Sequence, residues 1–248
     1  MKTEWDYSSL AQAYLQRPDY APSVIEWIVT QVGPGPLDIC DVGAGVAHLT
    51  IPFARRGHRV CAVEPNDEMR KLGVERTREF KNVTWSEGVG EKTGQPAASF
   101  DLVSFGSSFN VTDRALALKE TARLLRPRGW FFCVWNHRDL TDPLQAEIEK
   151  TIASMVPSYS YGTRREDQRA VIDASKLFAP ALQCEGAIVA SQSRADIVEA
   201  WRSHATLQRQ AGASFLQVVG AIEAVLTRRG GDRFEVPYTS RAWAAQRG

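Results

Sequence analysis

Short apolar runs alternate with amphipathic segments through the middle of the chain. The apolar runs predict five strands, at residues 37–44, 58–64, 82–85, 100–106 and 129–136. Between them, apolar residues at helical spacing predict helices at residues 46–56, 67–80 and 114–125, the second capped by Asn66 or Asp67. Strands that alternate with helices indicate a parallel sheet with helices on both faces. In such a sheet, ligands bind beyond the carboxyl ends of the strands.

The alternation breaks outside residues 37–136. Before it, residues 23–29 predict a helix that ends near "VGPGP". After it, the pattern predicts a helix at 137–156, a loop at 157–168, a sixth strand at 182–191, helices at 194–210 and 213–229, and a last strand at 234–245. The predicted sheet is therefore interrupted by a mainly helical insertion before its last strand.

Composition places the chain among ordinary globular proteins. Its 248 residues are 44% hydrophobic and 24% charged, with a net charge of +1. Such a balance does not steer a protein toward nucleic acid or an anionic membrane. No run approaches the roughly 18 apolar residues of a membrane span, and "MKTEWDYSSL" lacks the apolar region of a signal peptide. We therefore expect a cytoplasmic protein with neither a membrane nor a nucleic-acid partner.

The four cysteines do not follow the spacing of a zinc or disulfide framework. They are Cys40, Cys61, Cys133 and Cys184, and no two of them form a C-x-x-C pair. Three lie within apolar, strand-like runs. This usage is typical of free thiols in a reducing compartment, and we expect no metal site.

The turn after the first strand, "DVGAGVAHLT", carries the first chemical signal. Gly43 and Gly45 bracket one small residue where a strand should lead into a helix. The dinucleotide fingerprint G-x-G-x-x-G requires a third glycine, and this chain has His48 there. The turn therefore predicts a nucleotide-like ligand but argues against an NAD-dependent oxidoreductase. The second strand ends at Glu64, where an acid in nucleoside-binding folds accepts hydrogen bonds from the ribose hydroxyls.

Four motifs in this order resemble the class I S-adenosylmethionine-dependent methyltransferases. They are "DVGAGVAHLT", "AVEPNDEM", "SEGVGEKTGQPAASFDLVSFGSSF" and "ALKETARLLRPRGWF". The segment "WDYSSLAQAYLQRPDY" is similar to the N-terminal segment of small-molecule methyltransferases of the ubiquinone-biosynthesis and trans-aconitate type, where aromatic and arginine residues cover the cofactor. The resemblance implies an α/β fold with a doubly wound, mostly parallel seven-stranded sheet, a seventh strand inserted antiparallel, and a helical cap.

This fold divides the chain into four parts. We assign a lid and helix to residues 1–36, a Rossmann-like cofactor-binding core to 37–136, and a substrate cap with the sixth strand to 137–210. Residues 211–248 then supply a final helix and the strand that completes the core sheet.

The resemblance implies S-adenosyl-L-methionine as the cofactor and assigns its contacts. The two glycines let the backbone approach the methionine portion, and Asp41 presents an acceptor toward the amino-acid end or its supporting backbone amides. Glu64 should hold the ribose, while Pro65 and Met69 flank the adenine. The expected cofactor residues are Tyr14, Arg17, Asp41, Gly43, Ala44, Gly45, Glu64, Pro65, Met69, Gly88, Val89, Gly90 and Ser107.

Catalytic candidates follow the fifth strand, in "NHRDL", and the cap helices. His137 could take a proton from the acceptor, and Arg138 could clamp a carboxylate or phosphate. A helix cap and a surface ion pair with Asp139 are the alternative interpretation of this motif. His204, in "EAWRSHATLQRQ", is the second catalytic candidate. The expected substrate-binding residues are Tyr7, Phe109, Asn110 and Arg138, although core packing explains Phe109 equally well.

Two further motifs bear on the substrate. "FGSSFN" at the end of the fourth strand lacks the N-P-P-Y or D-P-P-Y pattern of enzymes that methylate bases, which argues against nucleic acid. "SYSYGTRRED" favours a lid over a small anionic or hydroxylated substrate, with a surface loop or a nucleic-acid contact as alternatives. We expect His48 to belong to the cofactor turn or its helix, and His58 to be exposed.

We interpret the chain as a methyltransferase for a small molecule whose accepting atom is oxygen, nitrogen, carbon or a carboxylate. Two other functions stay open: a cofactor-binding scaffold without turnover and, less favoured, the NAD-dependent oxidoreductase. A homodimer is an open alternative for its assembly.

Overall fold

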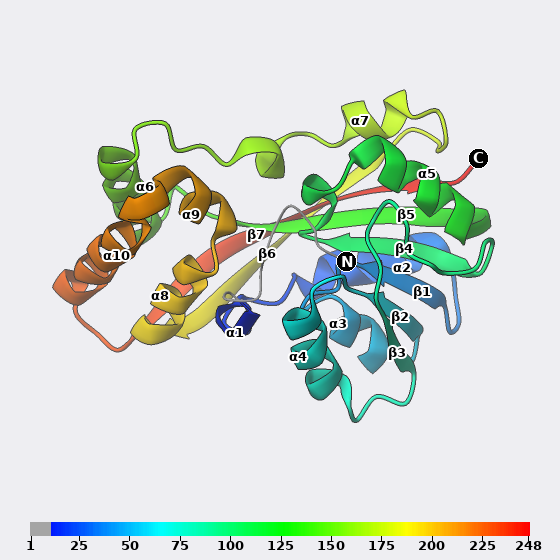
Figure 1. The fold of residues 1–248 in the computed structure, drawn as a ribbon, viewed down its shortest axis with the longest axis horizontal. Coiled ribbons are helices and arrows are strands. Elements are labelled where there is room, and N and C mark those ends of the chain that lie inside the picture. The colour runs from blue at the N-terminus through cyan, green and yellow to red at the C-terminus, as the bar shows by residue number, and fades with distance from the viewer. Residues whose placement is uncertain (1–10) are drawn as a thin grey trace.

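The computed structural model describes residues 11–248, and its centre is one seven-stranded sheet in the order β3-β2-β1-β4-β5-β7-β6 (Figure 1). The strands are β1 (Asp38–Val42), β2 (Arg59–Val63), β3 (Val83–Ser86), β4 (Phe100–Gly106), β5 (Leu125–Arg138), β6 (Leu182–Ser193) and β7 (Arg233–Gln246). The first five pair in parallel, and β7 lies antiparallel between β5 and β6. This confirms the doubly wound, mostly parallel sheet and its inserted antiparallel strand.

Helices cover both faces of the sheet. α2 (Pro22–Val32) and α3 (Thr50–Arg55) pack on one face, and α5 (Arg114–Leu124) and α7 (Arg169–Ala174) pack on the other. Successive β1 residues therefore serve different cores. The first core includes Ile28, Ile39 and Phe53, and the second includes Cys40, Leu118 and Ile172.

α4 (Asp67–Thr77) lies beside β3, and its sequence explains both its start and its packing. The Asn66 side chain caps it by accepting a hydrogen bond from the Met69 N–H at 3.0 Å. Gly73 lies in the middle of the helix, where a glycine normally weakens it. Here an added Cβ would overlap the Trp85 indole. The glycine is therefore required by close packing of the helix on β3.

The predicted starts of two helices are wrong for identifiable reasons. Residues 46–49 are turn rather than helix, because Gly45 and Ala47 have left-handed φ angles of 56° and 75°. The helix expected from residue 137 begins only at Pro143 as α6 (Pro143–Met155), capped by Asp142. β5 continues instead through Arg138, which pairs with Tyr238 of β7.

The long strands β5, β6 and β7 extend past the core and carry the cap (Figure 1). Their extensions pack with α6, α8 (Arg194–Arg202), α9 (Ala205–Ala211) and α10 (Phe215–Arg229). The shared core of this cap includes Ile148, Trp201, Ile222 and Val236. α10, which the sequence pattern grouped with the last strand, packs against α6 and α8. The short elements are α1 (Ala11–Tyr14), η2 (Phe109–Val111), η3 (Gly162–Arg165) and η4 (Gly212–Ser214).

One helical run within residues 11–248, Ala205–Arg229, has the length and composition that could cross a membrane. It consists of α9, η4 and α10, and Gly212 separates them with a φ of 53°. Val218, Ile222 and Leu226 of this run are buried in the core of the cap.

The structure also shows the environments of His58 and of the four cysteines. His58 is 4% exposed, not solvent-exposed as expected, because its Nδ1 accepts the Leu37 N–H at 3.2 Å. The four cysteines are free, with Cys40 and Cys133 buried. Within the described part of the chain, no group of three or more His, Cys, Asp or Glu side chains could hold a metal ion.

Candidate active site

A cavity of about 660 Å³ opens at the carboxyl ends of the parallel strands. Val42, Glu64 and Ser107 line it from the ends of β1, β2 and β4, and Asn136 and Arg138 line it from β5. Its volume lies within the range of small-molecule sites. The position agrees with the rule for ligands in open α/β sheets.

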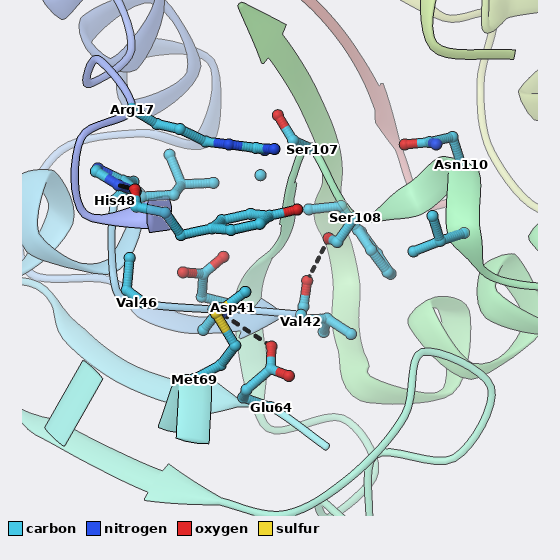
Figure 2. Close-up of a pocket in the computed structure, with 18 of the residues that line it drawn as sticks. Arg17, Asp41, Val42, Val46, His48, Glu64, Met69, Ser107, Ser108 and Asn110 are labelled. Carbon is cyan, nitrogen blue, oxygen red and sulfur yellow. Dashed lines mark hydrogen bonds between the residues drawn. The ribbon is translucent and has the colours of Figure 1, made fainter. Parts of the chain in front are cut away.

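The glycine turn forms one wall of this cavity. The Gly43 and Ala44 N–H groups donate to the Val63 carbonyl at 2.8 and 3.1 Å, which folds the turn back over β2. Gly43 has a φ of 66°, and a Cβ added there would lie 2.5 Å from the Ser108 Cβ. The Ser108 hydroxyl in turn donates to the Val42 carbonyl at 2.6 Å (Figure 2). The backbone at Gly43 is thus held close to strand β4 with no room for a side chain.

Glu64 is buried beside this turn, with 6% of its surface exposed. Its two oxygens accept the Gly45 and Asn66 N–H groups at 2.9 and 2.8 Å. Burial raises the pKa of Glu64 to about 7, although both N–H donors and Arg70 act in the opposite direction. A carboxylate has about four lone-pair sites, so Glu64 can accept further donors from a ligand in the cavity.

Asp41 is fully buried at the end of β1 and also borders the cavity. Its carboxylate accepts the Thr50 and Ser104 hydroxyls at 2.6 and 2.9 Å. Burial raises its pKa to about 6, while both hydroxyl donors lower it. Two side-chain hydroxyls therefore hold Asp41, and its contact with the amino-acid end of a cofactor stays a prediction.

The wall next to Glu64 is mainly apolar. Pro65, Met69, Val89 and Gly90, which were expected to surround the adenine, all line the cavity. Gly88 does not line it, because the residue is buried against the Thr93 carbonyl, and an added Cβ would lie 2.6 Å from that oxygen. Gly88 therefore serves local packing rather than ligand contact.

Tyr14 and Arg17 lie over the cavity on the segment around α1. The Arg17 guanidinium stacks 3.6 Å from the Tyr14 ring centroid and donates to the Ser203 hydroxyl and carbonyl at 3.0 and 2.6 Å. Figure 2 shows Arg17 and Glu64 on opposite sides of the cavity. His48 lines it too, and its Nε2 donates to the Tyr14 carbonyl at 2.8 Å. Tyr7 lies outside the described residues, so its substrate role stays a prediction.

Ser107 and Asn110 border the far side of the cavity, beyond the end of β4 (Figure 2). The Ser107 and Tyr20 hydroxyls are hydrogen-bonded at 3.0 Å, and Asn110 Oδ1 accepts the Trp135 indole N–H at 2.9 Å. Phe109 does not reach the cavity. It is fully buried and packs edge-to-face on Phe131, with ring centroids 5.2 Å apart, so the expectation of a substrate contact is wrong.

Comparisons with known proteins agree with this geometry. Residues 40–133, from β1 to β5, match the family model described as a methyltransferase domain. The part of the chain from β1 to β5 is thus similar to a methyltransferase domain.

Relatives of this methyltransferase domain include an uncharacterized methyltransferase of Mycobacterium tuberculosis, 36% identical over 134 residues, covering 54% of this chain and 53% of the relative. The ubiquinone/menaquinone biosynthesis C-methyltransferase UbiE of Caulobacter vibrioides is 29% identical over 144 residues, covering 52% and 56%. The chain thus spans about half the length of the curated relatives it matches.

Solved structures share the fold over most of the chain. YcgJ from Bacillus subtilis has a TM-score of 0.57 at 18% identity, covering 91% of this chain and 98% of that one. Geranyl diphosphate C-methyltransferase from Streptomyces coelicolor, solved with Mg²⁺, geranyl diphosphate and S-adenosyl-L-homocysteine, has a TM-score of 0.52 at 15% identity, covering 91% and 79%. These similarities establish the Rossmann-like methyltransferase fold.

His137 is turned away from the cavity of the methyltransferase domain. Successive side chains of a strand point to opposite faces, and its neighbours Asn136 and Arg138 are the ones that line the cavity. Burial lowers the pKa of His137 to about 3, and the charge of Arg164 adds to this. Its Nε2 is buried without a hydrogen-bond partner among the described residues. The expectation that His137 acts as a base toward the substrate is therefore wrong.

His204 does line the cavity, but its environment keeps it neutral. Burial holds its pKa well below the usual value, and the charges of Arg164 and Arg138 act in the same direction. Its Nδ1 accepts the Leu207 N–H at 3.2 Å, and its Nε2 lies 3.2 Å from Arg164 Nη1. A ring surrounded by donors and cations is a poor proton acceptor, so His204 fits a positioning role better than that of a base.

Several cavity residues could not be identified individually from the sequence. Tyr20, Asn136 and Tyr238 line the cavity, but no site role was predicted for them. Tyr20 ends the segment "WDYSSLAQAYLQRPDY" and Asn136 begins "NHRDL". Asn136 ties the N-terminal segment to β5 by donating to the Pro18 and Asp19 carbonyls at 3.1 and 3.0 Å. The signals available were membership of these two motifs for Tyr20 and Asn136, and the alternation of the final strand for Tyr238.

Proposed function

We propose that the protein is an S-adenosylmethionine-dependent methyltransferase that acts on a small molecule in the cytoplasm. The observation that carries this proposal is the buried Glu64 carboxylate beside the Gly43 turn, at the carboxyl end of the parallel sheet. An acceptor at this position is suited to a ribose diol. A cavity of about 660 Å³ also has room for a nucleoside cofactor and a small acceptor.

The residues present fit this cofactor. Gly43 offers bare backbone where an added Cβ would overlap its neighbour, and Glu64 retains acceptor capacity for both ribose hydroxyls. Pro65 and Met69 supply apolar surface for the adenine, and the backbone at Val89 and Gly90 lies within the cavity wall. When bound, the cofactor supplies a methyl group activated by its sulfonium.

The chain's own contribution is then mainly alignment. Arg17 and Tyr14 cover the cavity and offer a cation to the amino-acid end of the cofactor, while Asp41 stiffens the turn through Thr50. Since His137 does not line the cavity and burial holds the pKa of His204 well below its usual value, we propose that orientation and exclusion of water dominate. Alignment of two reactants can contribute roughly 7–11 kcal/mol. The acceptor assay should therefore include oxygen, nitrogen, carbon and carboxylate nucleophiles.

Titration calorimetry tests the cofactor assignment. S-adenosylhomocysteine should bind the wild type, NAD should give no heat, and Glu64→Ala should weaken binding by roughly 1.5–3 kcal/mol. Glu120→Ala is the matched control, because Glu120 pairs with Arg123 outside the cavity. Heat with NAD, or equal affinity in Glu64→Ala and the wild type, would contradict the proposal.

Turnover separates an enzyme from a cofactor-binding scaffold. Labelled S-adenosylmethionine should pass its methyl group to at least one member of a small-metabolite panel, and not to nucleic acid or lipid vesicles. Binding of the cofactor without any transfer would favour the scaffold. Sedimentation of the same sample would show whether the active species is a homodimer.

A further inference from the structure

The side of the cavity formed by the cap is basic. Arg17, Arg138 and Arg164 come from three separate segments of the chain, and all three line the cavity. Asp41 and Glu64 line the other side, next to the glycine turn. A ligand that spans the cavity therefore meets acceptors at one end and cations at the other.

The Arg138 side chain is stacked between aromatic rings and donates no hydrogen bond to any residue within 11–248. Its guanidinium lies 4.0 Å from the ring centroid of the buried Trp201 and 5.7 Å from that of Tyr238. Stacking fixes the plane of a guanidinium and leaves the N–H groups along its edge available. Among the described residues, no carboxylate lies within 4.0 Å of it.

Arg164 reaches the cavity from η3 and contacts His204 at 3.2 Å. It too has no carboxylate within 4.0 Å among the described residues. Burial lowers its pKa, and the neighbouring charges of Arg17 and Arg138 lower it further. Several arginines outside the cavity contact carboxylates. Arg126, for example, contacts two carboxylates, at 2.9 and 2.7 Å.

Arg138 and Arg164 are half-buried, line the same cavity and are close enough for their charges to interact. Two such cations without an anion repel and are poorly solvated. An arginine cannot escape this by losing its proton, because its ordinary pKa is above 12. An oxyanion bound by both guanidinium groups would relieve the repulsion and the poor solvation, and it would accept several charge-assisted hydrogen bonds. We propose that Arg138 and Arg164 bind an anionic group of the methyl acceptor, a carboxylate or a phosphate.

This inference rests on the proposed function and adds the class of substrate. Its geometry places the anion at the cap, while the cofactor occupies the side of Glu64 and the glycine turn. The accepting atom then lies between the two ends, near the end of β4. A neutral analogue of the acceptor would leave both guanidinium groups unpaired and would bind less tightly.

Calorimetry on protein saturated with S-adenosylhomocysteine tests the site directly. Inorganic phosphate and succinate are the two anionic probes, and succinamide is the neutral control for the second. At least one anion should bind, and Arg138→Gln and Arg164→Gln should each weaken that binding about 10- to 150-fold. Whichever anion binds more tightly identifies the chemical group that the acceptor carries.

Arg202→Gln is the matched control. Arg202 lies on α8, pairs with Glu199 and is not part of the cavity wall, so the same loss of charge should leave anion affinity unchanged. Arg164→Gln should not lower the melting temperature of the unliganded protein, because it removes repulsion. If a glutamine variant fails to fold, the corresponding lysine variant keeps the charge, loses the planar fork and should show intermediate affinity.

The outcomes separate this inference from the proposed function. If S-adenosylhomocysteine does not bind the wild type, the proposed function fails and the inference fails with it. If it binds, but neither anion binds more tightly than succinamide, the inference alone is overturned. Equal anion affinity in the wild type and both cavity variants would also overturn it.

Discussion

Glu64 carries a charge that destabilises the folded protein, and Glu64→Gln should expose this effect. Raising a pKa from 4.5 to about 7 by burial corresponds to roughly 3 kcal/mol. Because the pKa of Glu64 is higher in the folded state than in the unfolded state, its contribution to the free energy of unfolding is complete below about pH 4.5. That contribution is lost as the pH rises to about 7. Glutamine resembles the protonated acid at every pH. The variant should therefore match the wild type near pH 4 and exceed its unfolding free energy by up to about 3 kcal/mol near pH 8.

Urea unfolding of the cofactor-free proteins across this pH range measures the difference. Glu120→Gln is the control of opposite sign, because Arg123 holds the pKa of Glu120 down at about 2. Its contribution is present above about pH 4.5 and is lost as the pH falls through 2, so this variant should be the less stable one at neutral pH. If Glu64→Gln is equal to or less stable than the wild type near pH 8, the reasoning from burial is refuted.

Three other predictions follow from the same contacts. Gly73→Ala should lower the melting temperature despite alanine's higher helix propensity, because the Trp85 indole that packs on α4 leaves no room for a Cβ. Gly220→Ala in α10 is the control, because a Cβ there meets open space and should raise the free energy of unfolding by up to about 1 kcal/mol. Once a substrate is known, His137→Ala and His204→Ala should leave the acidic limb of the kcat–pH profile unchanged; its loss in either variant would reinstate a histidine base. Deleting residues 1–18 should give a folded protein that retains S-adenosylhomocysteine poorly, as judged by circular dichroism and calorimetry, and unchanged affinity would make this segment merely structural.

The sequence was informative where local pattern determines structure. β1, β4 and the middle of β5 are buried on both faces, so their apolar runs were recognisable. The cavity-lining residues of the glycine turn, 41–46, are consecutive in the chain. The start of β5 was missed because Pro127 and Gly129 suggest a turn. The structure accommodates them with a shift in the β4–β5 register and a left-handed Arg128, φ 64°.

Side-chain direction and long-range contacts were beyond local pattern. His137 and Arg138 are neighbours, but only the strand's pairing with β7 decides which one faces the cavity. Phe109 follows two serines at a strand end, and only the packing of η2 shows that it points into the core. Arg164 lies in a loop motif with three open interpretations, and it joins Arg138 only through the folded cap.

The three strands shared by the core and the cap have a mechanical consequence. Swinging the cap away from the core would require breaking the continuous ladders that join β5, β7 and β6. Hinged closure of two lobes is therefore disfavoured, and the cap and core should melt in a single cooperative transition. Ligands would instead enter past the segment that carries Arg17, whose guanidinium joins it to the cap by donating to the Ser203 hydroxyl and the Ser203 carbonyl. Ser203→Ala, which removes the hydrogen bond to the hydroxyl, should therefore raise the rate at which ligands enter and leave the cavity, while the sheet itself stays intact.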